Sequence, residues 1–205
     1  MSTKLYIVRH SQTVGNVERR FTGRKDYDIT EEGNMYIEKL TNRLKNVKFD
    51  KVYSSTSGRA IKTVEPLAKL NGLKIETNEN LCEMYFGIYD GWKWEDVNKI
   101  NPRIEELHKE TNEIMGIPEQ ESTKEVANRV YSYIRAISIE NSKKVLLIAS
   151  HGIAIESFIR KVNNEKFSEN IEINSQKNTS VNIVEYDNKK DKFKVLLLND
   201  LSHLI

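Results

Sequence analysis

Two short apolar runs that each end in a histidine constrain this chain more than any other feature of its sequence. Residues 4–8 lead directly into Arg9-His10, and residues 144–150 lead into His151. A short uninterrupted apolar run is typical of a strand that is buried on both faces. Strands of this kind belong to parallel sheets covered by helices, so the chain is expected to fold as an α/β protein.

Segments with helical periodicity alternate with the strand-like runs. Between residues 30 and 44, Thr30 is the expected N-cap, and Ile37, Leu40 and Leu44 fall on one helix face. The same reasoning predicts helices at residues 30–44, 57–70, 94–100, 103–115, 122–139 and 153–162. Further strands are predicted at residues 51–55, at residues 73–75 as a short edge strand, and at residues 180–186 and 193–198.

This order of elements predicts a three-layer sandwich, in which a mostly parallel central sheet carries helices on both faces. The last two strands follow one another across a short polar turn, so they are expected to form an antiparallel hairpin at one end of the sheet. No internal repeat or linker interrupts the 205 residues. We therefore expect one domain over residues 1–205, with an irregular helical insertion at about residues 100–121.

Charge and composition exclude several classes of function. The chain has 32 basic and 30 acidic residues, for a net charge of +2, and the two signs are interspersed. Without a basic block, neither nucleic acid nor an anionic membrane is expected as a partner. The apolar runs are far shorter than the roughly 20 residues that span a bilayer. With no leader-like segment and Cys82 as the single cysteine, we expect a soluble cytoplasmic protein.

The polar residues that follow the strands suggest a phosphate site. In an open α/β sheet, ligands bind at the carboxyl ends of the strands. His10 and His151 each follow one strand, and the strand at residues 51–55 leads into a helix that carries Arg59. A histidine or an arginine alone at such a place is usually structural. Two imidazoles with two guanidinium groups form a rarer combination, suited to a phosphoryl group.

The first of these clusters resembles a known signature. Arg9-His10-Ser11-Gln12-Thr13 is similar to the Arg-His-Gly-Glu-Thr motif of the histidine phosphatase (phosphoglycerate mutase-like) superfamily. Further blocks match in order across nearly the whole chain: Asn16; Phe21-Thr22-Gly23; Asp28-Ile29-Thr30 and Gly33; Ser54-Ser55; Arg59-Ala60 and Thr63; Leu81, Glu83, Gly87 and Gly91; Ser150-His151-Gly152; Asn178-Thr179-Ser180; and residues 198–203. Ser11 and Gln12 depart from the signature, and neither departure removes a catalytic group.

The resemblance implies a phosphoglycerate mutase-like fold and a histidine acid phosphatase-type phosphomonoesterase that works without a metal or cofactor. His10 would attack phosphorus and form a phosphohistidine, while Arg9, Arg59 and His151 stabilise the transferred group. Cations next to His10 should also lower its pKa and keep it neutral. Glu83 would protonate the leaving oxygen and then deprotonate the attacking water. The resemblance assigns the rest of the phosphate cradle to Asn16, Thr22, Gly23 and the Gly152 backbone.

Two activities of the family share this machinery. Its cofactor-dependent phosphoglycerate mutases carry extra cations near the acid loop, which hold the substrate carboxylate. Here Met84 replaces an arginine of that loop, Phe86 a tyrosine, and Trp94 a lysine. Hydrolysis of a small-molecule phosphate ester is therefore the favoured interpretation, with the mutase as the alternative. A third interpretation, a non-catalytic phosphate-binding relative, conflicts with the presence of both nucleophile and acid.

The aromatic residues near the acid loop allow two interpretations. Tyr85, Phe86, Tyr89, Trp92 and Trp94 would suit a bulky or partly apolar ester. They would equally serve to pack the insertion against the sheet. The sequence leaves this choice open, together with the identity of the substrate and the oligomeric state.

Overall fold

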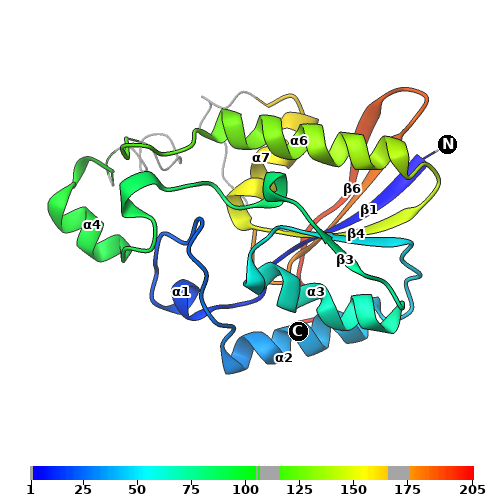
Figure 1. Ribbon diagram of the computed structural model, residues 1–205, viewed down its shortest axis with the longest axis horizontal. Helices are drawn as coiled ribbons and strands as arrows, with labels where there is room; N and C mark the ends of the chain where they lie inside the picture. Colours follow the sequence, from blue (N-terminus) through cyan, green and yellow to red (C-terminus); the bar gives the residue numbers. More distant parts are fainter. Residues whose placement is uncertain (1, 105, 107–115, 166–175) are drawn as a thin grey trace.

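A six-stranded sheet forms the centre of the computed structural model, which describes residues 2–104, 106, 116–165 and 176–205 (Figure 1). The strand order is β3-β2-β4-β1-β5-β6. The strands are β1 Ser2–Arg9, β2 Lys51–Ser54, β3 Ile75–Thr77, β4 Val145–Ser150, β5 Val181–Asp187 and β6 Lys192–Asp200. The first four pair in parallel, whereas β5 runs antiparallel to β1 and β6 antiparallel to β5. The predicted parallel sheet with an antiparallel hairpin at one end is confirmed.

The register of the central strands brings the predicted site residues together. Arg9 of β1 pairs with Ser150 of β4, and Ala149 of β4 pairs with Ser54 of β2. The carboxyl ends of these three strands therefore lie in one row. β1 and β4 are followed at once by the predicted site residues His10 and His151, and β2 leads through Ser55 toward the helix that carries Arg59.

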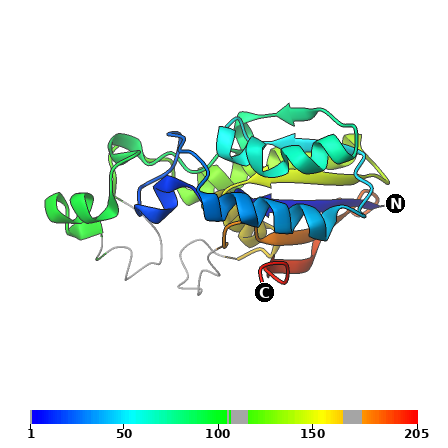
Figure 2. The ribbon, with the colours of Figure 1, turned by 90° about the horizontal axis from the view of Figure 1, so that it is seen from below.

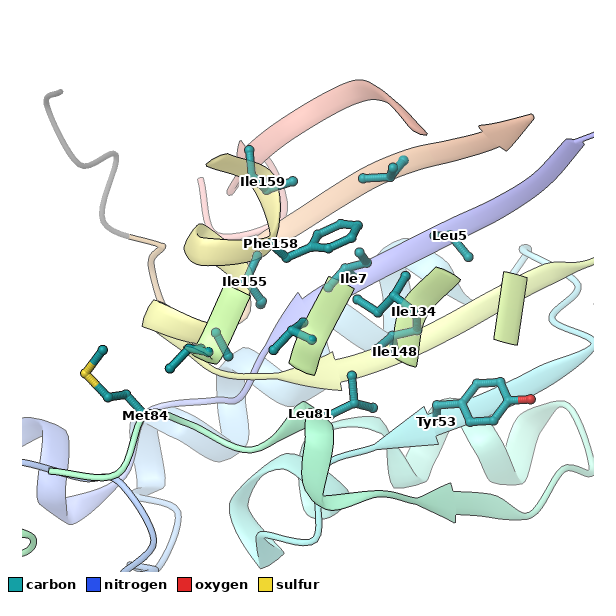
Figure 3. Close-up of a cluster of buried hydrophobic side chains, with 14 of the residues drawn as sticks. Leu5, Ile7, Tyr53, Leu81, Met84, Ile134, Ile148, Ile155, Phe158 and Ile159 are labelled. Carbon is teal, nitrogen blue, oxygen red and sulfur yellow. The ribbon is translucent and has the colours of Figure 1, made fainter. Parts of the chain in front are cut away.

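Helices cover both faces of the sheet, as expected (Figures 1 and 2). α2 (Glu31–Leu44) and α3 (Gly58–Leu70) lie on one face, and α6 (Thr123–Glu140) and α7 (Gly152–Val162) on the other. Side chains alternate along β1: Leu5 and Ile7 join the core under α6 and α7, whereas Tyr6 and Val8 join the core under α2 and α3. Figure 3 shows the core under α6 and α7, in which Ile7 and Ile148 of the sheet face Ile155 and Phe158 of α7.

The shorter helices gather beyond the carboxyl ends of the parallel strands. They are α1 (Val14–Val17), the single 3₁₀ turns η1 (Glu79–Leu81) and η2 (Gly87–Tyr89), and α4 (Trp94–Ile100). Both views show α1 and α4 at this end of the molecule (Figures 1 and 2). The loops that carry the site residues are thus enclosed between the sheet and these short elements.

The sequence-based position of the edge strand was wrong by two residues. We expected residues 73–75, but β3 is Ile75–Thr77. Gly72 adopts φ +65° at the end of α3, and the Leu73 N–H donates to the Ala68 carbonyl at 2.9 Å. Leu73 therefore still belongs to the helix-terminating turn, which leaves it no ladder hydrogen bond to give.

The described residues do not test two other expectations. The helix predicted at residues 103–115 falls mostly outside them, and the single-domain organisation of residues 1–205 stays a prediction. Across the described ranges, no helix is both long and apolar enough to cross a lipid bilayer.

Candidate active site

His10 lies at the end of β1 and is only 2% exposed. Its Nδ1 lies 2.7 Å from the Ser11 carbonyl oxygen. A carbonyl oxygen can only accept, so Nδ1 carries the proton and the neutral ring presents an unprotonated Nε2. The backbone around the ring is held as well, because the His10 N–H donates to Ser150 O at 2.9 Å and the His10 carbonyl accepts from Asn178 Nδ2 at 3.0 Å. The sequence position thus delivers a fixed imidazole with a free electron pair.

His151 is fully buried beside His10, with ring centroids 5.1 Å apart. Arg59 Nη2 lies 3.1 Å from His151 Nδ1, and Ser55 Oγ lies 2.7 Å from His151 Nε2. A guanidinium group can only donate, so Nδ1 accepts and Nε2 carries the proton that is donated to Ser55. Each histidine is thereby held in one orientation and one tautomer by a different partner.

Arg59 comes from the first turn of α3 and is 1% exposed. Its Nη1 donates to Asp26 Oδ1 at 2.9 Å and to the Lys25 carbonyl at 2.8 Å. Its Nη2 donates to the carbonyls of Thr22 and Gly23 at 3.2 and 2.9 Å, besides the contact with His151. The Nε of this guanidinium is buried and has no hydrogen-bond partner among the described residues. Arg59 therefore keeps one buried N–H donor uncommitted within the described part of the chain.

The electrostatic environment keeps both histidines neutral. Burial lowers the pKa of His10 well below its usual value of 6.5, and the Arg9 and Arg59 cations lower it further. Burial, followed by Arg59 and His10, lowers the pKa of His151 in the same direction. The expected effect of the two arginines on His10 is confirmed, but burial is the larger cause.

This environment makes the stability of the fold sensitive to acid. Below pH 6.5 the unfolded chain takes up protons on His10 and His151 that the folded chain does not bind. The free energy of unfolding must therefore decrease as the pH is lowered. We expect a loss of up to about 1.4 kcal/mol per pH unit for each histidine below pH 6.5, and none from these groups above pH 7. Urea unfolding in phosphate-free buffers at pH 7.5, 6.5 and 5.5 measures the slope.

The matched variant for this measurement is His151→Asn, which removes one of the two groups. Its free energy of unfolding should depend less steeply on pH than that of the wild type. Burial also lowers the pKa of His203, to about 4, but that contribution is present in both proteins and cancels in the comparison. Equal slopes would show that His151 does not lose its proton on folding.

Arg9 and Glu83 flank the start of α7. A Cβ at Gly152 would lie 3.6 Å from the Arg9 guanidinium and 3.6 Å from Glu83 Oε2. One Nη of Arg9 donates to the Gln176 carbonyl, while the buried Arg9 Nε has no hydrogen-bond partner among the described residues. The Arg9 guanidinium and the Glu83 carboxylate thus both lie close to Gly152 at the helix N-terminus, where a Cβ would make only ordinary van der Waals contacts with them.

Glu83 is 7% exposed, and its carboxylate is held by backbone N–H groups. Oε1 accepts from the N–H groups of Met84 and Ala154 at 2.9 and 3.1 Å. Oε2 accepts from the N–H of Ile153 at 3.2 Å. The N-terminus of α7 thus orients the carboxylate, with Oε2 on the side of Gly152 and Arg9.

The remaining residues predicted to bind phosphate fall into two groups. Asn16 lies close to the histidine cluster: its Oδ1 accepts from Thr13 and, at 3.2 Å, from Asn178 Nδ2, which also holds His10. Thr22 and Gly23 are near Arg59, but they face it with their carbonyl groups. The Gly23 N–H is already donated to Asp90 Oδ1 at 2.7 Å. The direct part of these two residues in the phosphate cradle stays a prediction.

The two departures from the signature make structural contacts. Ser11 is fully buried, and its Oγ donates to the Gly33 carbonyl at 2.6 Å, while its N–H donates to Thr63 Oγ1. Gln12 Oε1 accepts from the hydroxyl of Thr30, the N-cap of α2. Both residues tie the loop after β1 to the start of α2 instead of facing His10.

The residues that distinguish this chain from the mutases pack in or against the hydrophobic core. Met84 and Phe86 are 0% and 4% exposed and belong to the core under α6 and α7. Trp94 stacks on Phe21 with ring centroids 4.9 Å apart. Among the five aromatic residues near the acid loop, Trp92 is the exposed one, with 46% of its surface accessible. For Met84, Phe86 and Trp94 the structure favours the packing interpretation.

Several residues that shape the site were not identified from the sequence. Asp26 pairs with Arg59, and Asp90 accepts the backbone N–H groups of residues 23–25 that surround it. Ser55 and Asn178 hold the histidines, and both lie in blocks that match the family signature. Nothing in the local sequence of Asp26 or Asp90 marks these contacts, since each joins segments more than 30 residues apart.

The fold and the buried cluster of histidines, arginines and a carboxylate define an α/β enzyme of phosphoryl transfer. The chain belongs to the histidine phosphatase superfamily (branch 1), whose family model matches residues 5–201. It is 26% identical to phosphoglycerate mutase-like protein 4 of Arabidopsis thaliana, with 98% of this chain and 86% of that protein covered. It is 30% identical to putative phosphoserine phosphatase 2 of Hydrogenobacter thermophilus, with 76% of each covered.

Among solved structures, Bacillus stearothermophilus YhfR superimposes with a TM-score of 0.92 at 27% identity, covering 99% of this chain and all of that one. The predicted superfamily, its phosphoglycerate mutase-like α/β fold and the assignment to phosphomonoesterases are confirmed.

Proposed function

We propose that this enzyme hydrolyses small phosphate monoesters through a phosphohistidine formed on His10 Nε2. The observation that carries the proposal is the state of His10. It is buried and neutral, and because Nδ1–H is committed to the Ser11 carbonyl, the unprotonated nitrogen is Nε2. A neutral imidazole held in this way is ready to act as a nucleophile.

In the first step the Nε2 electron pair attacks phosphorus and the ester P–O bond breaks. The departing oxygen takes a proton from protonated Glu83, which leaves the carboxylate ionised and the phosphoryl group on Nε2. In the second step Glu83 removes a proton from water as the water oxygen attacks phosphorus and the N–P bond breaks. Inorganic phosphate leaves, and His10 and protonated Glu83 are restored.

The cationic groups would stabilise the charge on the transferred phosphoryl oxygens. The unpartnered Nε–H groups of Arg9 and Arg59 support this role, because a buried donor needs an acceptor. Burial and Arg59 favour the neutral form of His151, whereas a phosphoryl dianion bound beside it would favour the protonated form. Asn16 Nδ2 and the Gly152 N–H complete the proposed cradle.

For Thr22 and Gly23 we propose an indirect part in the same site. Their carbonyls hold the Arg59 Nη2 group, and the turn that contains them is fixed by Asp90. These two residues thus set the direction in which Arg59 Nε–H points.

Water is the proposed acceptor of the phosphoryl group. A mutase must hold the phosphorylated acid so that a bound hydroxyl competes with about 55 M water, which requires close positioning. At the mutase carboxylate-binding positions, Met84 and Phe86 are buried in the core, and Trp94 is partly buried and packs against it. The relative named a putative phosphoserine phosphatase also supports hydrolysis.

A direct assay separates the two activities. We expect the enzyme to release inorganic phosphate from several unrelated monoesters, including phosphoserine, a monophosphoglycerate and nitrophenyl phosphate. It should interconvert 2- and 3-phosphoglycerate poorly even when bisphosphoglycerate is supplied to phosphorylate His10. Phosphate release and isomerisation are measured on the same sample. Rapid isomerisation with negligible phosphate release would establish the mutase instead.

The charge distribution and the single cysteine bear on the partner and the location of the enzyme. We propose a small-molecule phosphate ester as the partner, with neither nucleic acid nor a membrane involved, and a cytoplasmic location. The even distribution of 32 basic and 30 acidic residues supports the first part. A free and buried Cys82 is compatible with a reducing compartment.

A further inference from the structure

Arg129, in the middle of α6, binds the backbone of the segment that carries Glu83. Its Nη1 donates to the carbonyls of Asn80 and Cys82 at 2.9 and 2.8 Å. Its Nη2 donates to the carbonyl of Glu83 itself at 3.0 Å. One side chain thus fixes three carbonyl groups in a stretch of four residues.

The other N–H groups of Arg129 are bound to Glu121. Nε donates to Oε1 at 2.5 Å and Nη2 to Oε2 at 2.8 Å, and both side chains are largely buried. Glu121 also meets the acid segment directly, since its N–H donates to the Tyr85 carbonyl at 3.0 Å and its Oε2 accepts from the Tyr85 N–H at 3.3 Å. All five N–H groups of the guanidinium are used, so its orientation is fully determined.

The segment around Glu83 is therefore fixed at two points. The carboxylate is held by the Ile153 and Ala154 N–H groups of α7, and the main chain is held by Arg129 of α6. α6 and α7 belong to one core cluster on the same face of the sheet. Because α7 holds the Glu83 carboxylate and α6 holds the main chain of the same segment, the position of Oε2 relative to His10 depends on both helices.

We propose that Arg129 is a positioning residue for proton transfer by Glu83. Its contacts keep the Glu83 carboxylate at the distance from the leaving oxygen that general acid catalysis requires. A displacement of about 1 Å in such a group can cost on the order of 100-fold in rate. This inference rests on the proposed function, in which Glu83 is the acid.

A comparison of leaving groups tests the role. Nitrophenolate departs without a proton, whereas an alkoxide needs one. For Arg129→Gln we expect kcat/KM for an alkyl phosphate to fall roughly 10- to 100-fold, and that for nitrophenyl phosphate to fall by less than about 3-fold. The ratio kcat/KM is chosen because it excludes the later hydrolysis of phosphohistidine, in which Glu83 acts as base.

α6 offers a matched control. Arg135 lies six residues further along the helix and pairs with Asp191 through Nε and Nη2, but the pair is exposed and remote from Glu83. Arg135→Gln removes an equivalent two-bond ion pair from the same helix. It should change kcat/KM for the two substrates by similar small factors.

A double variant separates positioning from general structural support. Once Glu83→Gln has removed the proton donor, adding Arg129→Gln should have little further effect on alkyl phosphate hydrolysis. Multiplicative losses, or an equal loss on both substrates in Arg129→Gln alone, would overturn the proposal. If Arg129→Gln fails to fold, Glu121→Gln loosens the same guanidinium and should show the same preference on a smaller scale.

The failure of the underlying function has its own signature. If Glu83→Gln itself lowers kcat/KM equally for both substrates, Glu83 is not the acid, and the proposed function fails at that residue. If Glu83→Gln discriminates between the substrates and Arg129→Gln does not, only the positioning role is wrong.

Discussion

Replacement of His10 by asparagine is expected to abolish turnover. The asparagine amide can still donate a hydrogen bond to the Ser11 carbonyl, as His10 Nδ1 does at 2.7 Å, but it has no atom at the position of Nε2. Without a nucleophile the covalent path is closed. We expect kcat to fall by roughly 10⁴-fold or more for every substrate, as the loss of a catalytic nucleophile does elsewhere.

The covalent intermediate provides the direct measurement. Wild-type enzyme mixed briefly with a ³²P-labelled substrate and quenched should carry label that is labile to acid and stable to base, as phosphohistidine is. His10→Asn should carry none, while its circular dichroism and thermal unfolding remain those of a folded protein. Label of the same stability on the variant would place the nucleophile elsewhere, with His151 a candidate because its ring centroid lies 5.1 Å from that of His10.

Replacement of Glu83 by glutamine should produce the second largest loss in kcat/KM, confined to substrates with poor leaving groups. The carboxylate is buried, oriented by three N–H groups and adjacent to the Arg9 guanidinium, and the amide is close to it in size. For alkyl phosphates we expect a fall in kcat/KM of about 10²- to 10⁴-fold, the usual contribution of general acid catalysis.

A plot of the logarithm of kcat/KM against the pKa of the leaving alcohol tests this expectation. For the variant the plot should become steeper, because charge on the departing oxygen is no longer neutralised. Activated aryl phosphates should lose little. An unchanged slope would assign the proton transfer to a group other than Glu83.

The parts of the fold that could be predicted are those with local signals. The runs that became β1 and β4 are mostly apolar, and Thr30 caps its helix as expected. The position of β3 was missed because three residues hold too little pattern to separate a strand from the end of the preceding helix. The helix ends and central strands followed from short-range chemistry, and the edge of the sheet did not.

The site divides in the same way. His10, His151 and Arg59 follow predicted strands directly, so reasoning from strand ends could find them. Glu83 lies in a loop and was identified only through the family resemblance. Arg129 contacts residues 46 to 49 positions earlier in the chain, and no periodicity records such a contact. The long-range hydrogen bonds that orient these side chains could not be predicted from the sequence.

The place of the histidines in the sheet affects how the enzyme loses its activity. β4 and β1 each have a hydrogen-bonded neighbour on both sides, and helices cover both faces. Amide protons in such strands exchange with solvent only when the whole molecule opens, whereas a loop held by side chains opens at lower free-energy cost. We therefore expect gentle denaturation to open the loop of Glu83 before these strands. An ageing or warming sample should then pass through a state that still accepts phosphoryl groups from activated esters but no longer protonates an alkoxide leaving group.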